Sequence, residues 1–308
     1  MSTYNGERFL AEQLDSILAQ TEPDWRLSVS DDGSCDGTIG ILEAYAGKDD
    51  RIRFRRNERN LGPAANFYLM ALDVAAEGDR NRWYCFADQD DVWLPEKLAT
   101  LAEVMSAMDQ PGFPGALYSD VCLIDENGEE IAPSYYGAMH VQPHDADLAH
   151  MLMENKMIGQ TMMVNHALLE VALANEKKTG HIPKHMIMHD WWFALIAAAF
   201  GKAYDVGKVL GRYRQHGSNA IGGTDFMTYV KSRAEKIPET RQKLLADIRQ
   251  GQEFLELFGD ELDPQKKEIL EAFARLDRCG KMEKLAVIRR YGFYKSGMTR
   301  RIMTDILV

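Results

Sequence analysis

The sequence has little of what marks secreted, membrane-spanning or zinc-binding proteins. Its four cysteines are scattered over 308 residues and form no CxxC pair, which argues against a structural zinc site and favours a reduced compartment. No apolar run reaches the roughly 18 residues that a membrane-spanning helix needs, and no signal peptide is recognised at the N-terminus. Together these features predict a cytoplasmic protein.

Positive charge is also scarce over most of the chain. The net charge is −11 at pH 7, so nucleic acid is not an expected partner. Residues 280–308 differ, because seven lysines and arginines there face two acidic residues, which gives a net +5 and leaves −16 for the rest. This basic tail, which also carries many apolar residues, predicts peripheral contact with the inner face of the plasma membrane. Packing against the rest of the chain and homodimerisation are the alternatives.

Apolar periodicity predicts strands that alternate with helices in the first part of the chain. Such alternation is typical of an α/β fold with a mostly parallel sheet and helices on both faces. The expected helices are 7–20, 37–45, 63–77 and 95–108, and the expected strands are 25–30, 51–55 and 83–87.

The later part of the chain is expected to be mainly helical. Residues 121–131 contain Glu-Asn-Gly, which is typical of a hairpin turn. Two short strands are expected, one near residue 203 and one at residues 209–213. The glycine-rich stretch from His216 to Asp225 is the expected start of a C-terminal helical region, in which no strand is predicted.

Two acidic loops follow expected strands, DDGS at residues 31–34 and DQDD at residues 88–91. Open α/β sheets bind ligands beyond the carboxyl ends of their strands. The spacing of Asp88 and Asp90 lets two carboxylates converge on one Mg²⁺ or Mn²⁺ ion, which commonly bridges to a diphosphate. The alternative is a solvated acidic turn in which Asp90 or Asp91 caps the next helix.

Four segments in order, STYNGERFLAEQLDSILAQT, VSDDGSCDGT, RNLGPAANF and FADQDDVWLPEKL, resemble the family 2 glycosyltransferases of GT-A fold. The resemblance covers roughly residues 2–217 and implies a nucleotide-sugar donor, with dTDP or UDP as the nucleotide. The motifs DQDDVW, HDWW and YRQHGSN are most similar to the bacterial rhamnosyltransferase branch, which uses dTDP-rhamnose.

The resemblance implies roles in nucleotide binding for four residues near the N-terminus. Ser2 and Tyr4 match positions that contact the base, and the Tyr4 ring would stack on it. Asp32 matches the carboxylate that binds the pyrimidine N3–H group, and its neighbour Asp31 would assist. The alternatives are a turn or helix cap for Asp31 and core packing for Tyr4.

The resemblance also implies a site for the diphosphate and its metal ion. Asp88 and Asp90 match the Asp-x-Asp motif that binds the metal and the nucleotide, with Asp90 the firmer metal ligand. His216 would contact the metal or a phosphate oxygen, and Arg214 would offset the diphosphate charge. The alternative for the last two residues is a polar strand end.

Asp190, in the segment HDWW, is the candidate catalytic base. Inverting transfer needs one carboxylate to deprotonate the acceptor hydroxyl. The family places its base in a pair formed by Glu, His or Gly followed by Asp, which His189-Asp190 matches. The alternative is a helix N-cap. His181 and His185 recur at the same spacing of four, but Pro183 interrupts them, so three loop histidines are expected rather than a zinc face.

The N-terminal match has one departure from the family pattern. Family members usually carry several apolar strand residues before the segment that matches STYNG, whereas here only Met1 precedes it. Either native residues precede Met1 or the sheet tolerates a short first strand.

The resemblance as a whole predicts an inverting, metal-dependent glycosyltransferase of surface polysaccharide synthesis. It would move a sugar, with rhamnose favoured, to a saccharide or lipid-linked saccharide acceptor. A sugar-1-phosphate nucleotidyltransferase and a non-catalytic nucleotide-sugar-binding protein are the alternatives. The expected divisions are a nucleotide-sugar-binding half at 1–120, an acceptor-binding half at 121–222 and a helical region at 223–308.

Overall fold

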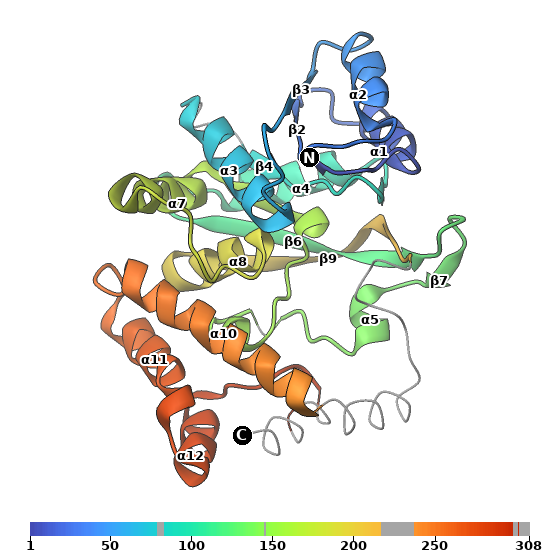
Figure 1. Ribbon diagram of the computed structural model, residues 1–308. Helices are drawn as coiled ribbons and strands as arrows, with labels where there is room; N and C mark the ends of the chain where they lie inside the picture. Colours follow the sequence, from blue (N-terminus) through green and yellow to red (C-terminus); the bar gives the residue numbers. More distant parts are fainter. Residues whose placement is uncertain (79–82, 145, 217–236, 298–300, 302–308) are drawn as a thin grey trace.

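The computed structural model describes residues 1–78, 83–144, 146–216, 237–297 and Arg301. It places a small parallel sheet, a larger mixed sheet and a group of C-terminal helices in sequence from one end of the molecule to the other (Figure 1). Within the described ranges, no helix is long and apolar enough to cross a membrane.

The small sheet has the order β1-β2-β3, with both pairings parallel as expected. Its first strand has two residues, and it pairs Ser2 with Ser30 and Thr3 with Asp31. The elements of this part are β1 (Ser2–Thr3), α1 (Leu10–Leu18), β2 (Leu27–Asp31), α2 (Thr38–Ala46), β3 (Ile52–Arg56) and α3 (Pro63–Ala76). Helix α1 buries Leu10, Leu14 and Ile17 against this sheet, because these residues recur at helical spacing.

The larger sheet has the order β4-β8-β6-β9-β5, with β7 beside β6. Among the described strands of this sheet only β6 and β9 run parallel, and the other four pairings are antiparallel. The expected parallel arrangement therefore holds for the small sheet but not here. The strands are β4 (Trp83–Cys85), β5 (Val92–Trp93), β6 (Gly115–Ile124), β7 (Glu130–Ala132), β8 (Met162–Asn165) and β9 (Lys202–Arg214).

The hairpin expected around Glu-Asn-Gly is confirmed between β6 and β7. The Asp125 amide donates to the Glu129 carbonyl oxygen at 2.9 Å, and the Gly128 amide donates to the Asp125 carbonyl oxygen at 3.1 Å. Gly128 has a φ of 86°, a conformation that glycine adopts without steric cost. A turn this short can join only antiparallel strands, which explains why β7 pairs antiparallel with β6.

Two other strand predictions need correction. Strand β8 was not expected, because its residues Met-Met-Val-Asn are all buried and show no alternation that would separate a strand from a helix. The two expected late strands form one strand, β9, which continues through Gly207 at a φ of 67°. Register shifts around Asp120 in β6 absorb this irregularity and keep the two strands paired.

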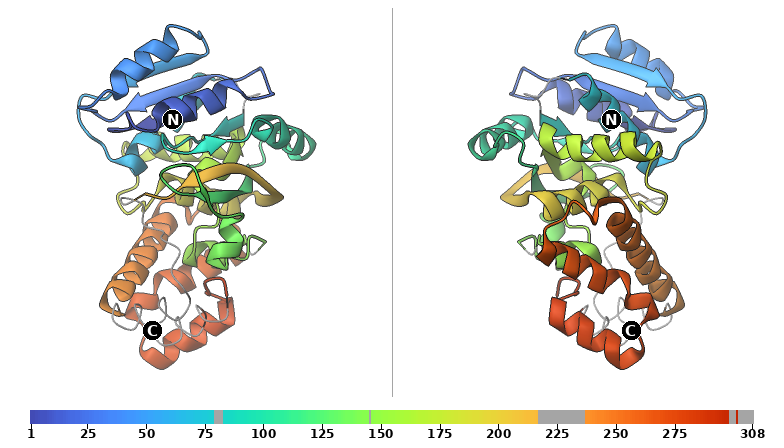
Figure 2. Two further views of the ribbon diagram at one scale, coloured as in Figure 1. Left: turned by 90° about the vertical axis from the view of Figure 1, so that its right-hand side faces the viewer. Right: turned by 90° about the vertical axis from the view of Figure 1, so that its left-hand side faces the viewer.

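Helices cover both faces of the larger sheet (Figure 2). On β6, Leu117 belongs to the cluster beneath α4 (Lys97–Met108), whereas its neighbours Ala116 and Tyr118 face a larger cluster. Alternate residues of a strand point to opposite faces, which explains this division. The larger cluster includes α3, α7 (His166–Thr179) and α8 (His189–Phe200).

The C-terminal region contains helices and no strand among its described residues. It consists of α10 (Ile237–Phe258), α11 (Pro264–Ala274), the short 3-10 helix η2 (Leu276–Arg278) and α12 (Lys281–Tyr291). The rings of Phe254 and Phe258 lie 5.3 and 6.3 Å from Trp192 of α8, so α10 shares the core of the α/β part. The expected boundary from His216 to Asp225 lies outside the described residues except for His216.

A buried lysine joins this region to the rest of the chain. The Lys156 amine is fully buried and donates to the Gln142 carbonyl oxygen at 2.9 Å and to the Ser296 hydroxyl at 2.6 Å. Lys156 follows α6 (Leu148–Met153), which comes after the short helix α5 (Tyr135–Met139). The described part of the basic tail therefore packs against the body of the protein, as one of the alternatives predicted.

Candidate active site

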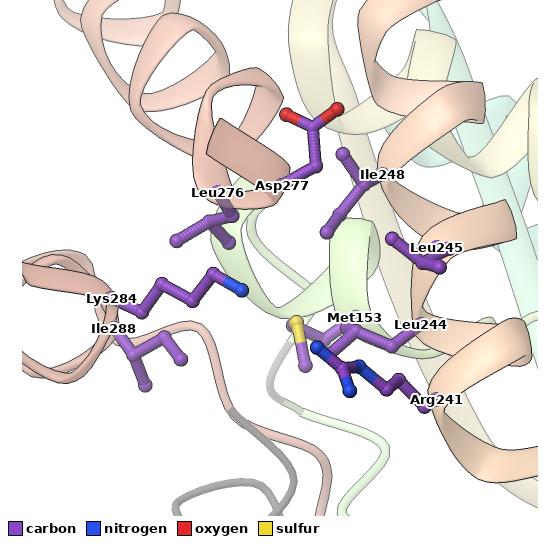
Figure 3. Close-up of a pocket in the computed structure, with 9 residues that line it drawn as sticks. All are labelled: Met153, Arg241, Leu244, Leu245, Ile248, Leu276, Asp277, Lys284 and Ile288. Atoms are coloured by element: carbon purple, nitrogen blue, oxygen red, sulfur yellow. The ribbon is translucent and has the colours of Figure 1, made fainter. Parts of the chain in front are cut away.

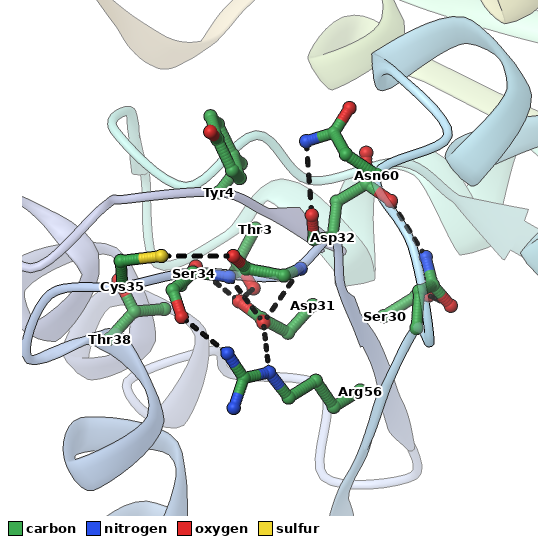
Figure 4. A network of polar contacts seen from close by, with 12 residues as sticks. Thr3, Tyr4, Ser30, Asp31, Asp32, Ser34, Cys35, Thr38, Arg56 and Asn60 are labelled. Atoms are coloured by element: carbon green, nitrogen blue, oxygen red, sulfur yellow. Dashed lines mark hydrogen bonds and ion pairs between the residues drawn. The ribbon is translucent and has the colours of Figure 1, made fainter.

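The DDGS loop after β2 is held by the first of its two carboxylates. The buried Asp31 carboxylate accepts bonds from the Gly33 and Ser34 amides at 3.1 and 2.9 Å and from the Thr3 hydroxyl at 3.0 Å (Figure 4). The Arg56 guanidinium lies 3.8 Å from the same carboxylate. These contacts place Asp31 in the turn role that was its alternative, and assistance in base binding stays a prediction.

Asp32 joins this loop to the RNLG segment between β3 and α3. Its carboxylate accepts from the Leu61 amide at 2.8 Å, the Gly62 amide at 2.8 Å and the Asn57 side-chain amide at 2.9 Å. These bonds give the RNLG segment a structural role, because its Leu61 and Gly62 amides must approach the buried Asp32 carboxylate closely. A contact of Asp32 with a pyrimidine N3–H stays a prediction, and it would share oxygen atoms that already accept from this loop.

Tyr4 lies beside the second acidic loop. The Gln89 side chain pairs with the Tyr4 backbone, accepting from its amide at 2.9 Å and donating to its carbonyl oxygen at 3.1 Å. The Tyr4 side chain is 50% exposed, so the core-packing alternative does not hold and the ring is accessible to a base. Gln89 was not singled out in the sequence, although it stands inside the DQDD motif.

Ser2 is part of a small network behind this surface. Its hydroxyl accepts from the Asn66 side-chain amide at 2.7 Å, and the same amide donates to the Ser30 carbonyl oxygen at 2.9 Å. The network fixes α3 against β1 and β2. The base contact predicted for Ser2 is not tested by these bonds.

Three carboxylates lie close together at the DQDD loop. Burial, followed by the charges of Asp90 and Asp190, raises the pKa of Asp88 to about 7. Burial together with the charges of Asp88 and Asp90 also raises the pKa of Asp91 well above its usual range. Like charges in a poorly hydrated site disfavour one another's ionised form, so this loop favours binding of a cation.

Asp90 and His216 lie together although 126 residues separate them, and their predicted contact with a metal ion stays a prediction. The Asp90 carboxylate lies 2.8 Å from the His216 Nε2 atom, and the His216 ring stacks on Phe9 at 5.6 Å. The carboxylate oxygen suits Mg²⁺ or Mn²⁺, whereas an imidazole nitrogen is more typical of transition-metal sites, so this pair favours Mn²⁺ of the two. In the described parts of the chain, no three His, Cys, Asp or Glu side chains are grouped closely enough to hold a metal alone.

Arg214 lies behind the acidic loop with its guanidinium buried. It donates to the Glu12 carboxylate at 2.6 Å and to the Asp90 carbonyl oxygen at 2.8 Å, while its backbone amide donates to the Asp91 carboxylate at 3.0 Å. The guanidinium also lies 4.6 Å from the centre of the Phe9 ring. Its donors are therefore directed at protein groups, and the predicted diphosphate contact stays a prediction.

Asp190 is the second residue of α8 and is buried. Its carboxylate accepts from the Gly159 amide at 2.8 Å and from the Trp191 amide at 2.6 Å. Burial is the main cause that raises its pKa to about 6. Met188 occupies the N-cap position, so the N-cap alternative for Asp190 does not hold. Gly159 was missed because no sequence pattern marks a backbone amide as a partner.

The neighbouring histidines have different surroundings. The His189 ring stacks on Phe67 at 4.1 Å, and burial lowers its pKa to about 3, so the ring is neutral. His181 and His185 are exposed in the irregular segment before α8. The prediction of three loop histidines therefore holds for His181 and His185 and is wrong for His189, which is the first residue of α8.

Solved glycosyltransferases share this fold. TarS from S. aureus in complex with UDP gives a TM-score of 0.52 at 16% identity, covering 95% of this chain and 90% of that chain. The mannosyltransferase PcManGT from Pyrobaculum calidifontis, in complex with GDP-Man and Mn²⁺, gives a TM-score of 0.50 at 19% identity, covering 98% and 76%. The architecture is thus the GT-A glycosyltransferase fold, with a C-terminal helical extension.

The N-terminal region is similar to known glycosyltransferases. Residues 1–118 match the model of glycosyl transferase family 2. The dTDP-rhamnosyl transferase RfbG of Shigella flexneri is 38% identical over 100 residues, 32% of this chain and 34% of the relative. WfgD of Escherichia coli, named a UDP-Glc:alpha-D-GlcNAc-diphosphoundecaprenol beta-1,3-glucosyltransferase, is 31% identical over 137 residues, 43% and 49% of the two chains. Residues 1–118 are thus similar to glycosyl transferase family 2.

These matches cover only part of the relatives. The chain spans between 34% and 63% of the length of the first curated relatives it matches. Neither the nucleotidyltransferase alternative nor the non-catalytic alternative gains support from them.

Replacing Arg214 by methionine should lower the free energy of unfolding by about 2 kcal/mol or more, because buried acceptors of the acidic loop lose their donor. Urea denaturation measures the change. Arg8→Met is the matched control, since the Arg8–Glu126 pair is exposed and is worth at most about 1 kcal/mol. Equal effects of the two substitutions would contradict the structural role of Arg214.

Proposed function

We propose that this protein is an inverting, metal-dependent glycosyltransferase that moves a sugar from a nucleoside diphosphate to a saccharide or lipid-linked saccharide. The observation that carries this proposal is the approach of the HDWW segment to the residues before the DQDD loop, where the ring centres of His189 and Phe86 lie 5.0 Å apart. A candidate base and a candidate metal-binding loop thus share one site at the strand ends, beside the accessible ring of Tyr4.

The reaction needs a base for the acceptor hydroxyl. In a single displacement, the acceptor oxygen forms a bond to the sugar C1 atom while the bond from C1 to the diphosphate breaks, and the hydroxyl proton passes to Asp190. A base works best when its pKa lies near the operating pH, and the pKa of about 6 for Asp190 suits this role. The Gly159 and Trp191 amides orient the carboxylate and keep it ionised.

Asp90 and His216 are proposed to hold Mg²⁺ or Mn²⁺ together with diphosphate oxygens. Asp88 is the third proposed ligand, although the three side chains are not grouped closely enough in the described structure to form a metal site alone. When bound, the ion supplies positive charge that stabilises the leaving diphosphate. The 2.8 Å approach of His216 to Asp90 is the observation that supports this assignment, and PcManGT carries Mn²⁺ in its complex.

The proposed donor is dTDP-rhamnose, within the broader class of dTDP- and UDP-sugars. The motif DQDDVW and the similarity to RfbG, named a dTDP-rhamnosyl transferase, support rhamnose. The similarity to WfgD, whose name specifies a diphosphoundecaprenol acceptor, supports a lipid-linked saccharide as acceptor in surface polysaccharide synthesis. Calorimetric titration of a panel of nucleotide sugars with Mn²⁺ tests the donor, and tighter binding of another sugar would reject rhamnose.

Asp190→Asn should reduce turnover by roughly a hundredfold or more, the usual scale for loss of a general base. Donor affinity should change little, because asparagine keeps an oxygen that accepts from a neighbouring amide. Release of nucleoside diphosphate measures turnover, and calorimetry measures affinity. Near-normal turnover would remove Asp190 from the mechanism, and release of pyrophosphate instead would indicate a nucleotidyltransferase.

Asp90→Ala should abolish the stabilisation of the protein by Mn²⁺ and dTDP.

The same stabilisation should depend on pH. In the metal-free protein, Asp88 has a pKa of about 7, above the unfolded value of about 4, so its contribution to stability is lost as pH rises through 7. A bound cation reverses this loss. The increase in melting temperature caused by Mn²⁺ and dTDP should therefore be larger at pH 8 than at pH 5. An unchanged increase in Asp90→Ala would refute the metal assignment.

The proposed location is cytoplasmic, with peripheral contact to the inner face of the plasma membrane through the basic tail. The exposed cations Lys281 and Arg289 on α12 support this contact, since each cation near an anionic surface contributes about 1 kcal/mol. Homodimerisation through the same helices is the competing proposal.

Sedimentation with vesicles separates these two uses of the tail. The full chain should sediment with phosphatidylglycerol vesicles and not with phosphatidylcholine vesicles, and Lys281→Glu/Arg289→Glu should weaken the binding. Equal sedimentation with the two kinds of vesicle would reject the membrane contact. A dimer at equilibrium in analytical ultracentrifugation, in the absence of lipid, would favour homodimerisation.

A further inference from the structure

A cavity of about 190 Å³ lies inside the C-terminal helical region (Figure 3). It opens between α6, α10, η2 and α12, at the opposite end of the molecule from β1, β2 and β3. Its apolar lining consists of Met153, Leu244, Leu245, Ile248, Leu276 and Ile288.

The size and lining of this cavity suit a hydrocarbon guest. Engineered cavities of about 150 Å³ with Leu, Ile and Phe walls stay dry and bind benzene. A nucleotide or a sugar would find few polar partners among these six side chains. The volume therefore fits part of one acyl chain better than it fits the substrates of the proposed transfer reaction.

Two cations face the same space. Arg241 of α10 and Lys284 of α12 line the cavity, and Figure 3 shows the guanidinium and the amine directed toward it from opposite walls. Among the residues that the structure describes, neither side chain has a hydrogen bond or ion pair. The carboxylate at the rim belongs to Asp277, which accepts from the Gln252 side-chain amide at 3.1 Å and lies 3.9 Å from Arg278.

An apolar cavity with two such cations has the chemistry of a site for an amphiphilic anion. We propose that it binds one acyl chain of an anionic membrane lipid, whose phosphate lies between Arg241 and Lys284. Exposed apolar groups near the site fit a membrane source, because Met282 at the start of α12 is 79% exposed. The proposal rests on the membrane contact proposed above and not on sugar transfer. It goes beyond that contact, because it assigns one discrete lipid site, whereas the contact itself needs only general charge attraction.

Titration of the full chain with a short-chain lipid below its micelle concentration tests the site without a membrane. Dihexanoyl phosphatidylglycerol should bind with one-to-one stoichiometry in a calorimeter. Dihexanoyl phosphatidylcholine has the same chains and no net charge. It should bind about tenfold more weakly, because a neutral headgroup is attracted less strongly to the two cations. Equal affinities would overturn the role of the two cations, and the absence of saturable phosphatidylglycerol binding would overturn the site.

Charge reversal locates the binding. Arg241→Glu/Lys284→Glu should weaken phosphatidylglycerol binding by about tenfold or more. Lys281→Glu/Arg289→Glu is the matched control, because it makes the same change in charge on exposed residues that do not line the cavity. Equal losses in the two variants would show diffuse attraction and overturn the proposal. If the control variant keeps its affinity for the short-chain lipid but no longer binds vesicles, the cavity and the surface contact are separate sites.

Filling the cavity provides an independent measurement. Leu244 is half-buried, so Leu244→Trp should place an indole in the space with little strain and abolish short-chain lipid binding. Ile131→Trp, at a 53% exposed position on β7, should bind as the unaltered chain does. Thermal unfolding confirms that both variants fold. Full affinity in Leu244→Trp would place the lipid elsewhere and refute the cavity as its site.

Discussion

The buried guanidinium of Arg214 connects three segments that the active site requires together. It lies at the end of β9, and it reaches the Glu12 carboxylate on α1 and the Asp90 carbonyl oxygen in the acidic loop. Its other donors reach the carbonyl oxygens of Asp125 and Glu126, at 3.3 and 3.4 Å, in the β6–β7 turn. A single planar group with five donors can serve so many acceptors, and lysine cannot. The position of His216 two residues later, beside Asp90, follows from this anchoring.

The acidic loop shows why such anchoring is needed. Desolvation and mutual repulsion raise the pKa of both Asp88 and Asp91, so the loop without a cation holds charge at a cost in free energy. A freely mobile loop would relax by turning these side chains to water. The bonds from Arg214 and the pairing of Gln89 with Tyr4 prevent that relaxation. The loop is therefore held in place before the proposed cation and diphosphate bind, and folding rather than binding supplies the free energy for that arrangement.

Much of the first half of the fold could be predicted from the sequence, because its elements carry clear signals. Strand-end carboxylates, the proline that opens α3 and the helical spacing in α1 all gave correct elements. The later part could not be predicted equally well. Strand β8 is buried on both faces and has no alternation, and the continuity of β9 through Gly207 depends on its long partner β6. Pairing between distant strands is a tertiary property that no local pattern contains.

The candidate site divides in the same way. The family resemblance implied one site for Asp88, Asp90, Asp190 and His216, and their roles there stay predictions. The sequence could not show which side-chain atoms already form hydrogen bonds within the protein. Asp31 and Asp32 satisfy their oxygens within the loops, and Arg214 satisfies its donors in the protein. Those partners are mostly backbone amides and carbonyls, which every residue carries and which no sequence signal distinguishes.

The segment between α6 and β8 connects the two ends of the molecule. Met153 lines the cavity in the helical region, and Lys156 holds Ser296 at 2.6 Å. The same segment supplies the Gly159 amide and the Asn155 side chain that bind Asp190. The carboxylate of the proposed base is thus positioned by a short segment whose other side is fixed by the C-terminal helices. Those helices are consequently part of the framework that orients the base, and not only an appendage to a complete GT-A domain.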